Sequence, residues 1–237
     1  MVNELTSDDS IVFHFTQGTI EETPPEDIAY WFGQPPHLRF FRYEAGVEPL
    51  SILNGLRDFE HDGSPEDAMR EFLGNDSAPL RPDIQRMLTE LYRTVEEEGP
   101  FYGVIGYSEG ATVAATLLVD DLKRREAKVQ PGSSFECAIF FHGWPPLATE
   151  GKETLLLSDD VGELITVPTF HVIGASDPYL VGSMALFSVC DSDTAQIFDH
   201  GKGHMVPRDA VTVKELSDRL RAFWEEIEEA KAEEEEG

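Results

Sequence analysis

A serine between two glycines is the first feature of this chain with the potential for chemistry. Residues 106–110 read Gly-Tyr-Ser-Glu-Gly and fit the G-x-S-x-G nucleophile elbow, in which a strand turns sharply into a helix. The apolar run Phe101–Ile105 before it predicts a buried strand. Ser108 would then present its hydroxyl at a helix N-terminus, where a developing negative charge is favoured. A strand-to-helix turn with a capping serine fits the same pentapeptide.

A serine hydroxyl needs a base to act as a nucleophile, and the base needs an orienting group. In α/β hydrolases the order along the chain is serine, acid, histidine. Asp177 follows the strand-like run Thr169–Ile173 through a Gly-Ala-Ser-Asp-Pro exit. His204 lies in a glycine-containing loop after the short strand-like run Thr194–Phe198. We therefore predict Ser108 as the nucleophile, Asp177 as the acid and His204 as the base.

Other residues compete for the positions of acid and base. His200, four residues before His204, is the strongest alternative base. His142 precedes Gly-Trp-Pro-Pro at another predicted strand end, from where it could line the site. The weaker candidates are His14, His37, His61 and His171 for the base, and Asp191, Asp193 and Asp199 for the acid.

The elements that must position these residues alternate between strands and helices. The predicted strands are Ile11–Phe15, Leu38–Tyr43, Phe101–Ile105, Phe135–Phe141, Thr169–Ile173 and Thr194–Phe198. The predicted helices are Ile84–Glu97, Glu109–Lys123 and Val211–Ala230. Apolar strands between helices predict a mainly parallel sheet with helices on both faces. Right-handed crossovers would bring the three catalytic loops to the same edge of that sheet.

Four segments together resemble the FSH family of fungal and eukaryotic serine hydrolases, which includes small esterases and polyketide-releasing thioesterases. These segments are Glu98–Ala111, Phe140–Pro146, Pro168–Pro178 and Gly203–Pro207, with a looser match through Phe13–Tyr43. The resemblance implies an α/β-hydrolase fold and cleavage of a carboxylic ester or thioester. Carried over by position, it implies the same nucleophile, acid and base: Ser108, Asp177 and His204.

The chain departs from this family at its N-terminus. Family members usually begin with a strand that ends in a His-Gly-x-Gly-like loop, which supplies one N–H of the oxyanion hole. No such motif precedes Ile11, and Ile11–Phe15 resembles the family's second strand. We therefore expect an N-terminally shortened fold, in which the Glu109 N–H serves as one oxyanion donor. Loss of the other donor would lower the rate on the order of a hundred- to a thousandfold. A truncated gene model, a replacement donor and a fold that has left hydrolysis behind remain the three explanations.

Aromatic residues near strand ends are the predicted substrate contacts. Trp31, Tyr107 and Trp144 would bind an acyl or aromatic portion of the substrate, and packing in the core is the alternative for the tryptophans. Residues 44–83 contain many glycines and prolines and would form either a lid over the site or a surface connection.

Composition limits the partners and the compartment. A net charge of −28, from 46 acidic and 18 basic residues, argues against nucleic acid and anionic membrane surfaces as partners. No apolar run approaches the roughly 18 residues of a membrane helix, and the polar N-terminus is not a signal peptide. Cys137 and Cys190 lie in or beside apolar stretches, which predicts free buried thiols and no metal site. We expect a cytoplasmic protein without a cofactor.

We predict one α/β-hydrolase domain over residues 1–224 and an acidic tail over residues 225–237. The tail carries eight glutamates and one lysine and would extend the last helix before it frays. The predicted substrate is a small-molecule acyl ester or thioester, such as a polyketide or other metabolite acyl group, free or bound to a carrier protein. Acyl transfer by the same serine and a degenerate fold with a binding or accessory function are the alternatives. The sequence makes no prediction of the oligomeric state.

Overall fold

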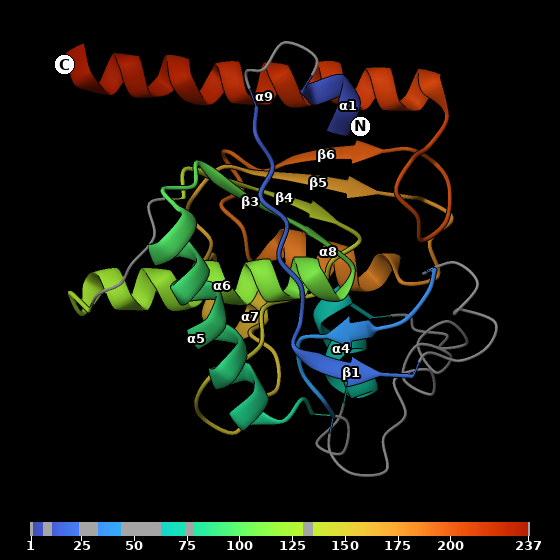
Figure 1. Cartoon of the computed structure of the whole chain (residues 1–237), viewed down its shortest axis with the longest axis vertical. Helices are drawn as coiled ribbons and strands as arrows, with labels where there is room; N and C mark the ends of the chain where they lie inside the picture. The colour runs from blue at the N-terminus through green and yellow to red at the C-terminus, as the bar shows by residue number, and fades with distance from the viewer. Residues whose placement is uncertain are drawn as a thin grey trace.

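A four-stranded parallel sheet forms the centre of the molecule, with the strand order β3-β4-β5-β6 (Figure 1). The computed structural model describes residues 2–6, 11–23, 33–43, 63–73, 78–129 and 135–236. The strands are β3 (Gly103–Tyr107), β4 (Cys137–Phe141), β5 (Thr169–Ile173) and β6 (Gln196–Asp199). Every residue of β4 and β5 is buried, as expected for central parallel strands with both faces covered.

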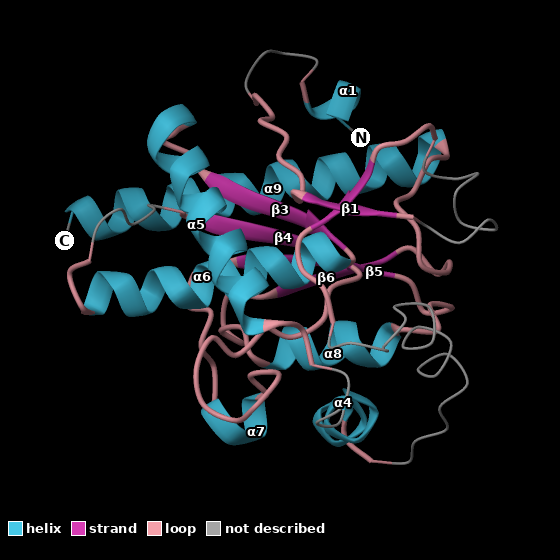
Figure 2. Ribbon diagram, turned by 60° about the horizontal axis from the view of Figure 1, so that its bottom comes forward, coloured by secondary structure: helices cyan, strands magenta, loops and turns pink. Residues whose placement is uncertain are grey.

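Helices cover both faces of this sheet, which confirms the predicted layering (Figures 1 and 2). On one side lie α4 (Pro65–Leu73), α5 (Arg81–Glu98), α6 (Glu109–Glu126), α7 (Ser158–Val161) and α8 (Leu180–Ser188). On the other side lie α1 (Val2–Leu5) and α9 (Ala210–Glu236). The buried apolar residues accordingly form two clusters, one on each side of the sheet.

The helix α9 packs along the sheet through one apolar face. Leu216, Leu220, Phe223 and Ile227 recur at helical spacing and are all buried, and the Phe223 ring lies 5.5 Å from that of Phe170 in β5. The helix continues through the acidic run to Glu236, so the predicted extension of the last helix over that run is confirmed.

An antiparallel pair of strands forms a second, separate sheet. It consists of β1 (Ile20–Glu22) and β2 (His37–Arg39). The predicted strand Leu38–Tyr43 is therefore too long, and Tyr43 forms only an isolated bridge with Pro79. Side chains take up the backbone donors beyond β2, because the Phe40 N–H donates to Glu109 and the Arg42 N–H donates to Asp83.

The predicted strand Ile11–Phe15 is wrong, since these residues form neither helix nor strand. Burial alternates over Ile11–His14, where Ile11 and Phe13 pack against the cluster under α9 and Val12 is exposed, and the alternation ends at Phe15, which is exposed as well. Alternation requires only one packed face, whereas a strand also requires a ladder partner. Within the described residues β3 pairs with β4 alone, so the strand before the elbow is an edge strand.

Cys137 and Cys190 are both buried and free, as predicted. No helix in the described ranges is long and apolar enough to cross a membrane.

Most of the segment predicted as a lid or a surface connection, residues 44–62 and 74–77, lies outside the described residues. The helix α4, inside the same segment, packs on α8. Ion pairs from Arg70 to Asp159 and Asp160 connect α4 to α7.

Candidate active site

The turn between β3 and α6 has the geometry of a nucleophile elbow. Ser108 has φ 53° and ψ −119°, a backbone conformation that residues other than glycine rarely adopt. Its N–H donates to the Phe141 carbonyl at the end of β4 (2.8 Å), and its carbonyl accepts from the Ala111 N–H (2.9 Å). The neighbouring strand and the first turn of the helix therefore hold the serine in this conformation.

The two elbow glycines differ in what they contribute. A Cβ at Gly106 would lie 2.3 Å from the Gly110 carbonyl oxygen and 2.4 Å from the Ala111 Cα, so that only glycine lets α6 approach β3 this closely. A Cβ at Gly110 would meet nothing within 4 Å. The steric requirement at this elbow therefore rests on Gly106.

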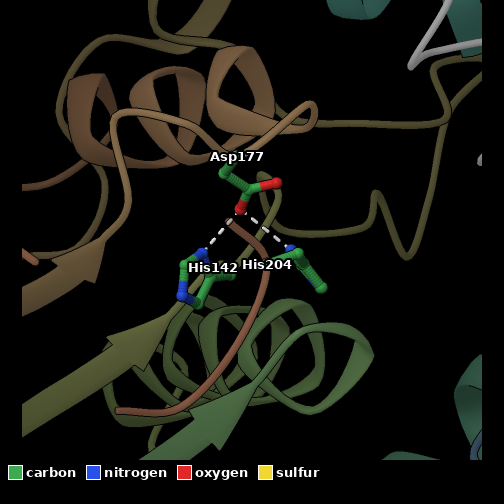
Figure 3. Close-up of side chains that lie close together, drawn as sticks. All are labelled: His142, Asp177 and His204. Atoms are coloured by element: carbon green, nitrogen blue, oxygen red, sulfur yellow. Dashed lines mark hydrogen bonds and ion pairs between the residues drawn. The ribbon is translucent and has the colours of Figure 1, made fainter. Parts of the chain in front are cut away.

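The three predicted catalytic residues form a continuous chain of hydrogen bonds. His204 Nε2 lies 3.0 Å from Ser108 Oγ. On its other side, His204 Nδ1 lies 2.9 Å from Asp177 Oδ2, the contact drawn in Figure 3. Asp177 comes from the loop after β5, and His204 comes from the loop after β6. This is the arrangement in which an imidazole removes a proton from a serine while a carboxylate holds its orientation.

Hydrogen bonds between the acid loop and the base loop fix their relative positions. The Ser176 hydroxyl donates to the Gly201 carbonyl (3.0 Å), and the Ser176 N–H donates to the Lys202 carbonyl (3.2 Å). The Tyr107 hydroxyl donates to the carbonyl of His204 itself (3.2 Å). The base is thereby tied to both β3 and the loop after β5.

Asp177 is ionised in this environment. Burial by itself raises the pKa of its carboxyl group, but hydrogen bonds from His142 and His204 outweigh this effect and hold the pKa well below its usual range. An ionised carboxylate only accepts hydrogen bonds, so both histidines donate through Nδ1. His204 then presents the lone pair of Nε2 to Ser108, which is the tautomer a general base requires.

The other histidines considered as the base do not contact Ser108 in the described structure. His142 is fully buried and lies against Asp177, with Nδ1 2.6 Å from Oδ2 (Figure 3). His200 contacts His142 rather than the serine, with 3.2 Å between the two Nε2 atoms. His171 packs between the rings of Phe140 and Phe187, and burial lowers its pKa to about 3.

The other candidates lie away from the serine. Asp199 accepts from the N–H groups of Ala175 and Gly201, and Asp191 accepts from the N–H of Asp193. His14 lies with its ring 5.4 Å from that of Phe101, and His61 lies outside the described residues. Sequence reasoning missed the direct contact between His142 and Asp177; its position at a strand end next to glycine is the one signal that pointed to it.

Glu109 connects the elbow to the segment after β2. Its carboxylate accepts from the Phe40 N–H (3.0 Å) and from Arg39 Nη2 (3.1 Å), a contact that the sequence did not predict. As the first residue of α6, Glu109 has an N–H without an acceptor inside the helix. The assignment of this N–H as an oxyanion donor stays a prediction.

The predicted substrate contacts differ in position. The Tyr107 ring lies 5.5 Å from the His204 ring and is partly exposed. Trp144 packs edge-on against Phe72 of α4 at 6.2 Å, and its ring lies so close to Gly182 of α8 that a Cβ there would be 2.3 Å from it. Trp31 lies outside the described residues. Substrate binding by all three stays a prediction.

The ligand atoms of His142, Asp177 and His204 lie within 4.8 Å of one another, close enough to suggest a metal site among the described residues. Two ligands of one tetrahedral ion at 2.0–2.1 Å would be about 3.3 Å apart. The observed separations from Asp177 Oδ2, 2.6 and 2.9 Å, are shorter than this and match hydrogen bonds. The group therefore has the geometry of a hydrogen-bonded carboxylate with two imidazoles.

Comparison with known proteins places the chain in a family. The model described as "Serine hydrolase (FSH1)" matches residues 10–216. The chain is 31% identical to "Esterase FPY3" of Fusarium mangiferae, over 77% of this chain and 79% of that protein. It is 28% identical to "Hydrolase phiM" of Talaromyces stipitatus, over 61% of this chain and 57% of that protein.

More distant proteins match part of the chain as well. It is 27% identical to "Esterase OVCA2" of Danio rerio, over 59% of this chain and 58% of that protein. Of this relative and the Talaromyces one, the chain therefore spans less than two thirds. Among solved structures, the acyl-protein thioesterase 2 of Zea mays matches with a TM-score of 0.45 and 15% identity, over 64% of this chain and 69% of that one.

Proposed function

Because the chain belongs to the FSH1 serine hydrolase family, we propose that Ser108, His204 and Asp177 form a triad that cleaves a carboxylic ester or thioester. The family match confirms the resemblance found in the sequence and makes the protein a hydrolase of the α/β-hydrolase type. The observation that carries the proposal is the hydrogen-bond chain from Ser108 Oγ through His204 to Asp177, which starts from a strained elbow.

In the first half of the reaction Ser108 Oγ attacks the acyl carbon while His204 Nε2 takes its proton. Asp177 stabilises the imidazolium that forms and keeps its orientation. The Glu109 N–H donates to the oxyanion, and the field of the α6 N-terminus favours the same negative charge. The imidazolium then donates its proton to the departing alcohol or thiol, which leaves an acyl group on Ser108.

In the second half a water molecule gives a proton to His204 and attacks the acyl group. The acid is released and Ser108 recovers its proton from the imidazolium, which closes the cycle. Tyr107, whose ring lies beside His204, would contact the acyl portion. The substrate class that fits the family is a small-molecule acyl ester or thioester, and we propose a polyketide or other metabolite acyl group, free or on a carrier protein.

Labelling with a fluorophosphonate probe tests the assignment of the nucleophile. We expect one label per chain in the wild type, none in Ser108→Ala, and normal labelling in Ser192→Ala, which removes an exposed hydroxyl in a turn away from the elbow. Retained labelling in folded Ser108→Ala, or none in the wild type, would overturn the proposal.

Product analysis then separates hydrolysis from acyl transfer. With p-nitrophenyl esters and acyl thioesters as substrates, release of the free acid in the presence of a competing alcohol supports hydrolysis. Conversion mainly to the ester of that alcohol would support a transferase that uses the same serine.

A further inference from the structure

One histidine outside the proposed triad, His142, contacts its acid, and a second, His200, contacts His142. His142 stands at the end of β4 with its side chain fully buried, and its Nδ1 is 2.6 Å from Asp177 Oδ2. This is the same oxygen that His204 contacts at 2.9 Å, while Asp177 Oδ1 accepts from the Tyr179 N–H at 2.8 Å. One carboxylate oxygen therefore serves two imidazoles, of which only one reaches the serine.

The second histidine determines where His142 carries its proton. His200 Nδ1 accepts from the Lys202 N–H (3.2 Å), so a neutral His200 carries its proton on Nε2. Burial, and then the neighbouring His142, lower the pKa of His200, which favours this neutral form. His200 Nε2 lies 3.2 Å from His142 Nε2, and only one proton fits between two nitrogens.

It follows that His142 accepts at Nε2 and donates at Nδ1. The direction agrees with the ionised carboxylate of Asp177, which requires a donor on His142 Nδ1. The Met205 carbonyl lies 3.1 Å from the same Nε2. If His200 no longer supplied its own proton, a second proton on His142 Nε2 could donate a hydrogen bond to this carbonyl.

The backbone at His142 supports a dedicated placement of this ring. His142 has φ 53°, in the left-handed region, while its N–H donates to the Val172 carbonyl at 3.1 Å. Such a conformation is strained in a residue other than glycine and persists only where surrounding contacts hold it. At His142 these contacts are β5 behind the backbone and Asp177 at the tip of the ring.

We propose that His142 is a positioning residue that shares Asp177 with the base and thereby weakens the hold of the carboxylate on protonated His204. This inference rests on the proposed triad. His200 keeps His142 neutral and in the donating tautomer. Because part of the carboxylate's charge is directed to His142, His204 gives up its proton more readily, and activity extends to lower pH. The titratable groups around His142 in the described residues are Asp177, His200, His204 and Tyr107. Those around His204 are Asp177, His142, Tyr107 and Tyr179.

Two substitutions at His142 distinguish its hydrogen bond to Asp177 from a role in packing alone. In His142→Asn, the amide Nδ2 takes about the position of imidazole Nδ1, and asparagine tolerates a positive φ. His142→Leu fills a similar volume without a donor. In kcat/KM against pH, we expect the acid limb of the leucine variant to move upward by about one pH unit, because Asp177 then attracts protonated His204 alone. The asparagine variant should keep the wild-type midpoint.

A purely structural role would lower stability and the plateau rate in both variants and leave the midpoints together. Equal midpoints in wild type and His142→Leu would therefore overturn the proposal. Thermal melting of both variants establishes that they are folded before the comparison is made.

Nuclear magnetic resonance of ¹⁵N-histidine-labelled protein tests the tautomers without reference to activity. At neutral pH we expect an imidazole N–H signal from Nδ1 of His142 and of His204, and from Nε2 of His200. The Nδ1 signal of His142 should be lost in His142→Asn. Protonation of His142 at Nε2 instead of Nδ1 would overturn the inference. If these signals appear in a protein that takes no fluorophosphonate label, the proposed function fails while the network stands.

A variant of His200 tests the outer link and serves if His142→Leu does not fold. In His200→Asn, the side-chain oxygen can still accept from the Lys202 N–H, so the loop keeps its turn. The donor to His142 Nε2 is lost, and the Met205 carbonyl becomes the available partner. We expect His142 to take up its second proton at higher pH than in the wild type; an unchanged titration of His142 would contradict the link.

Discussion

Backbone strain in the site is concentrated at two residues, Ser108 and His142, each with φ 53°. They stand at the ends of the neighbouring strands β3 and β4, and the Ser108 N–H donates to the Phe141 carbonyl next to His142. The two unusual conformations are therefore adjacent in space. One presents a hydroxyl to His204 and the other presents an imidazole to Asp177, so both strained residues aim a side chain at the same proton-transfer chain.

The elbow depends sterically on one of its two glycines, which gives a prediction at the scale of a residue. In Gly106→Ala, the added Cβ would meet backbone atoms of Gly110 and Ala111 at 2.3–2.5 Å. Backbone atoms cannot turn aside as a side chain can, so we expect a loss of about 3 kcal/mol. That corresponds to a fall in Tm of about 6–12 °C for a domain of this size.

Gly110→Ala is the matched control, because its Cβ enters open space near the start of α6. Alanine favours a helix over glycine, so the Tm should stay the same or rise. Thermal unfolding by circular dichroism compares the two variants. Equal losses of stability in both would refute the assignment of the steric requirement to Gly106.

At the scale of elements, a buried carboxylate ties α5 to the segment after β2. Asp83, in the first turn of α5, accepts from the Arg42 N–H and from its guanidinium at 2.8–3.0 Å. The hydrogen bond to the Arg42 side chain, more than any other effect, lowers the pKa of Asp83 to about 2. The contact between Asp83 and Arg42 therefore holds the segment after β2 in place. The same segment contains Phe40, whose N–H donates to Glu109 at the elbow.

The pH dependence of stability should report this contact. A carboxyl group whose pKa is lowered in the folded state stabilises above its ordinary pKa, near 4, and loses that contribution as the pH falls toward 2. We expect Asp83→Asn to lower the free energy of unfolding by about 2 kcal/mol at pH 7. Urea unfolding should then show the gap to wild type shrinking between pH 4 and pH 2. A gap that stays constant with pH would assign the effect to packing instead.

The elements also show what a sequence can and cannot predict. β5 and the start of α6 lie where the apolar pattern predicts them, because their neighbours in the chain are turn residues. The helix α8 escaped prediction because Leu180–Ser188 is apolar on nearly all sides, so that no amphipathic period marks it. Ile11–Phe15 is an apolar run of the kind that strands have, yet such a run contains no information about a ladder partner.

The contacts within the site also differ in how far the sequence predicts them. The meeting of Ser108, Asp177 and His204 could be predicted, because each residue follows its own strand in an order that parallel topology brings to one edge of the sheet. The contact between His142 and Asp177 could not, since it depends on which strands are neighbours: β4 lies between β3 and β5. Likewise, the pairing of Glu109 with Arg39 and Phe40 joins residues about 70 positions apart with no shared pattern.

At the scale of the whole molecule, acidity is the dominant property. The net charge is −28, and only part of it belongs to the end of α9, where eight glutamates and one lysine follow residue 224. The remainder lies on the body that carries the sheet and the site. Like charges repel in the compact state more than in the unfolded chain, so this excess opposes folding.

Salt should therefore stabilise the protein over the range in which it only screens charge. The Debye length falls from about 30 Å at 0.01 M to about 8 Å at 0.15 M, which removes most of the repulsion between distant surface carboxylates. We expect the Tm to rise by several degrees between these two NaCl concentrations. A variant that ends at Ala232 loses Glu233–Glu236 and Gly237, so its net charge changes from −28 to −24. The Tm of this shortened variant should depend less on salt than that of the wild type. If the wild-type Tm instead falls or stays level as NaCl is added, local ion pairs, such as those of Arg70 with Asp159 and Asp160, outweigh the repulsion.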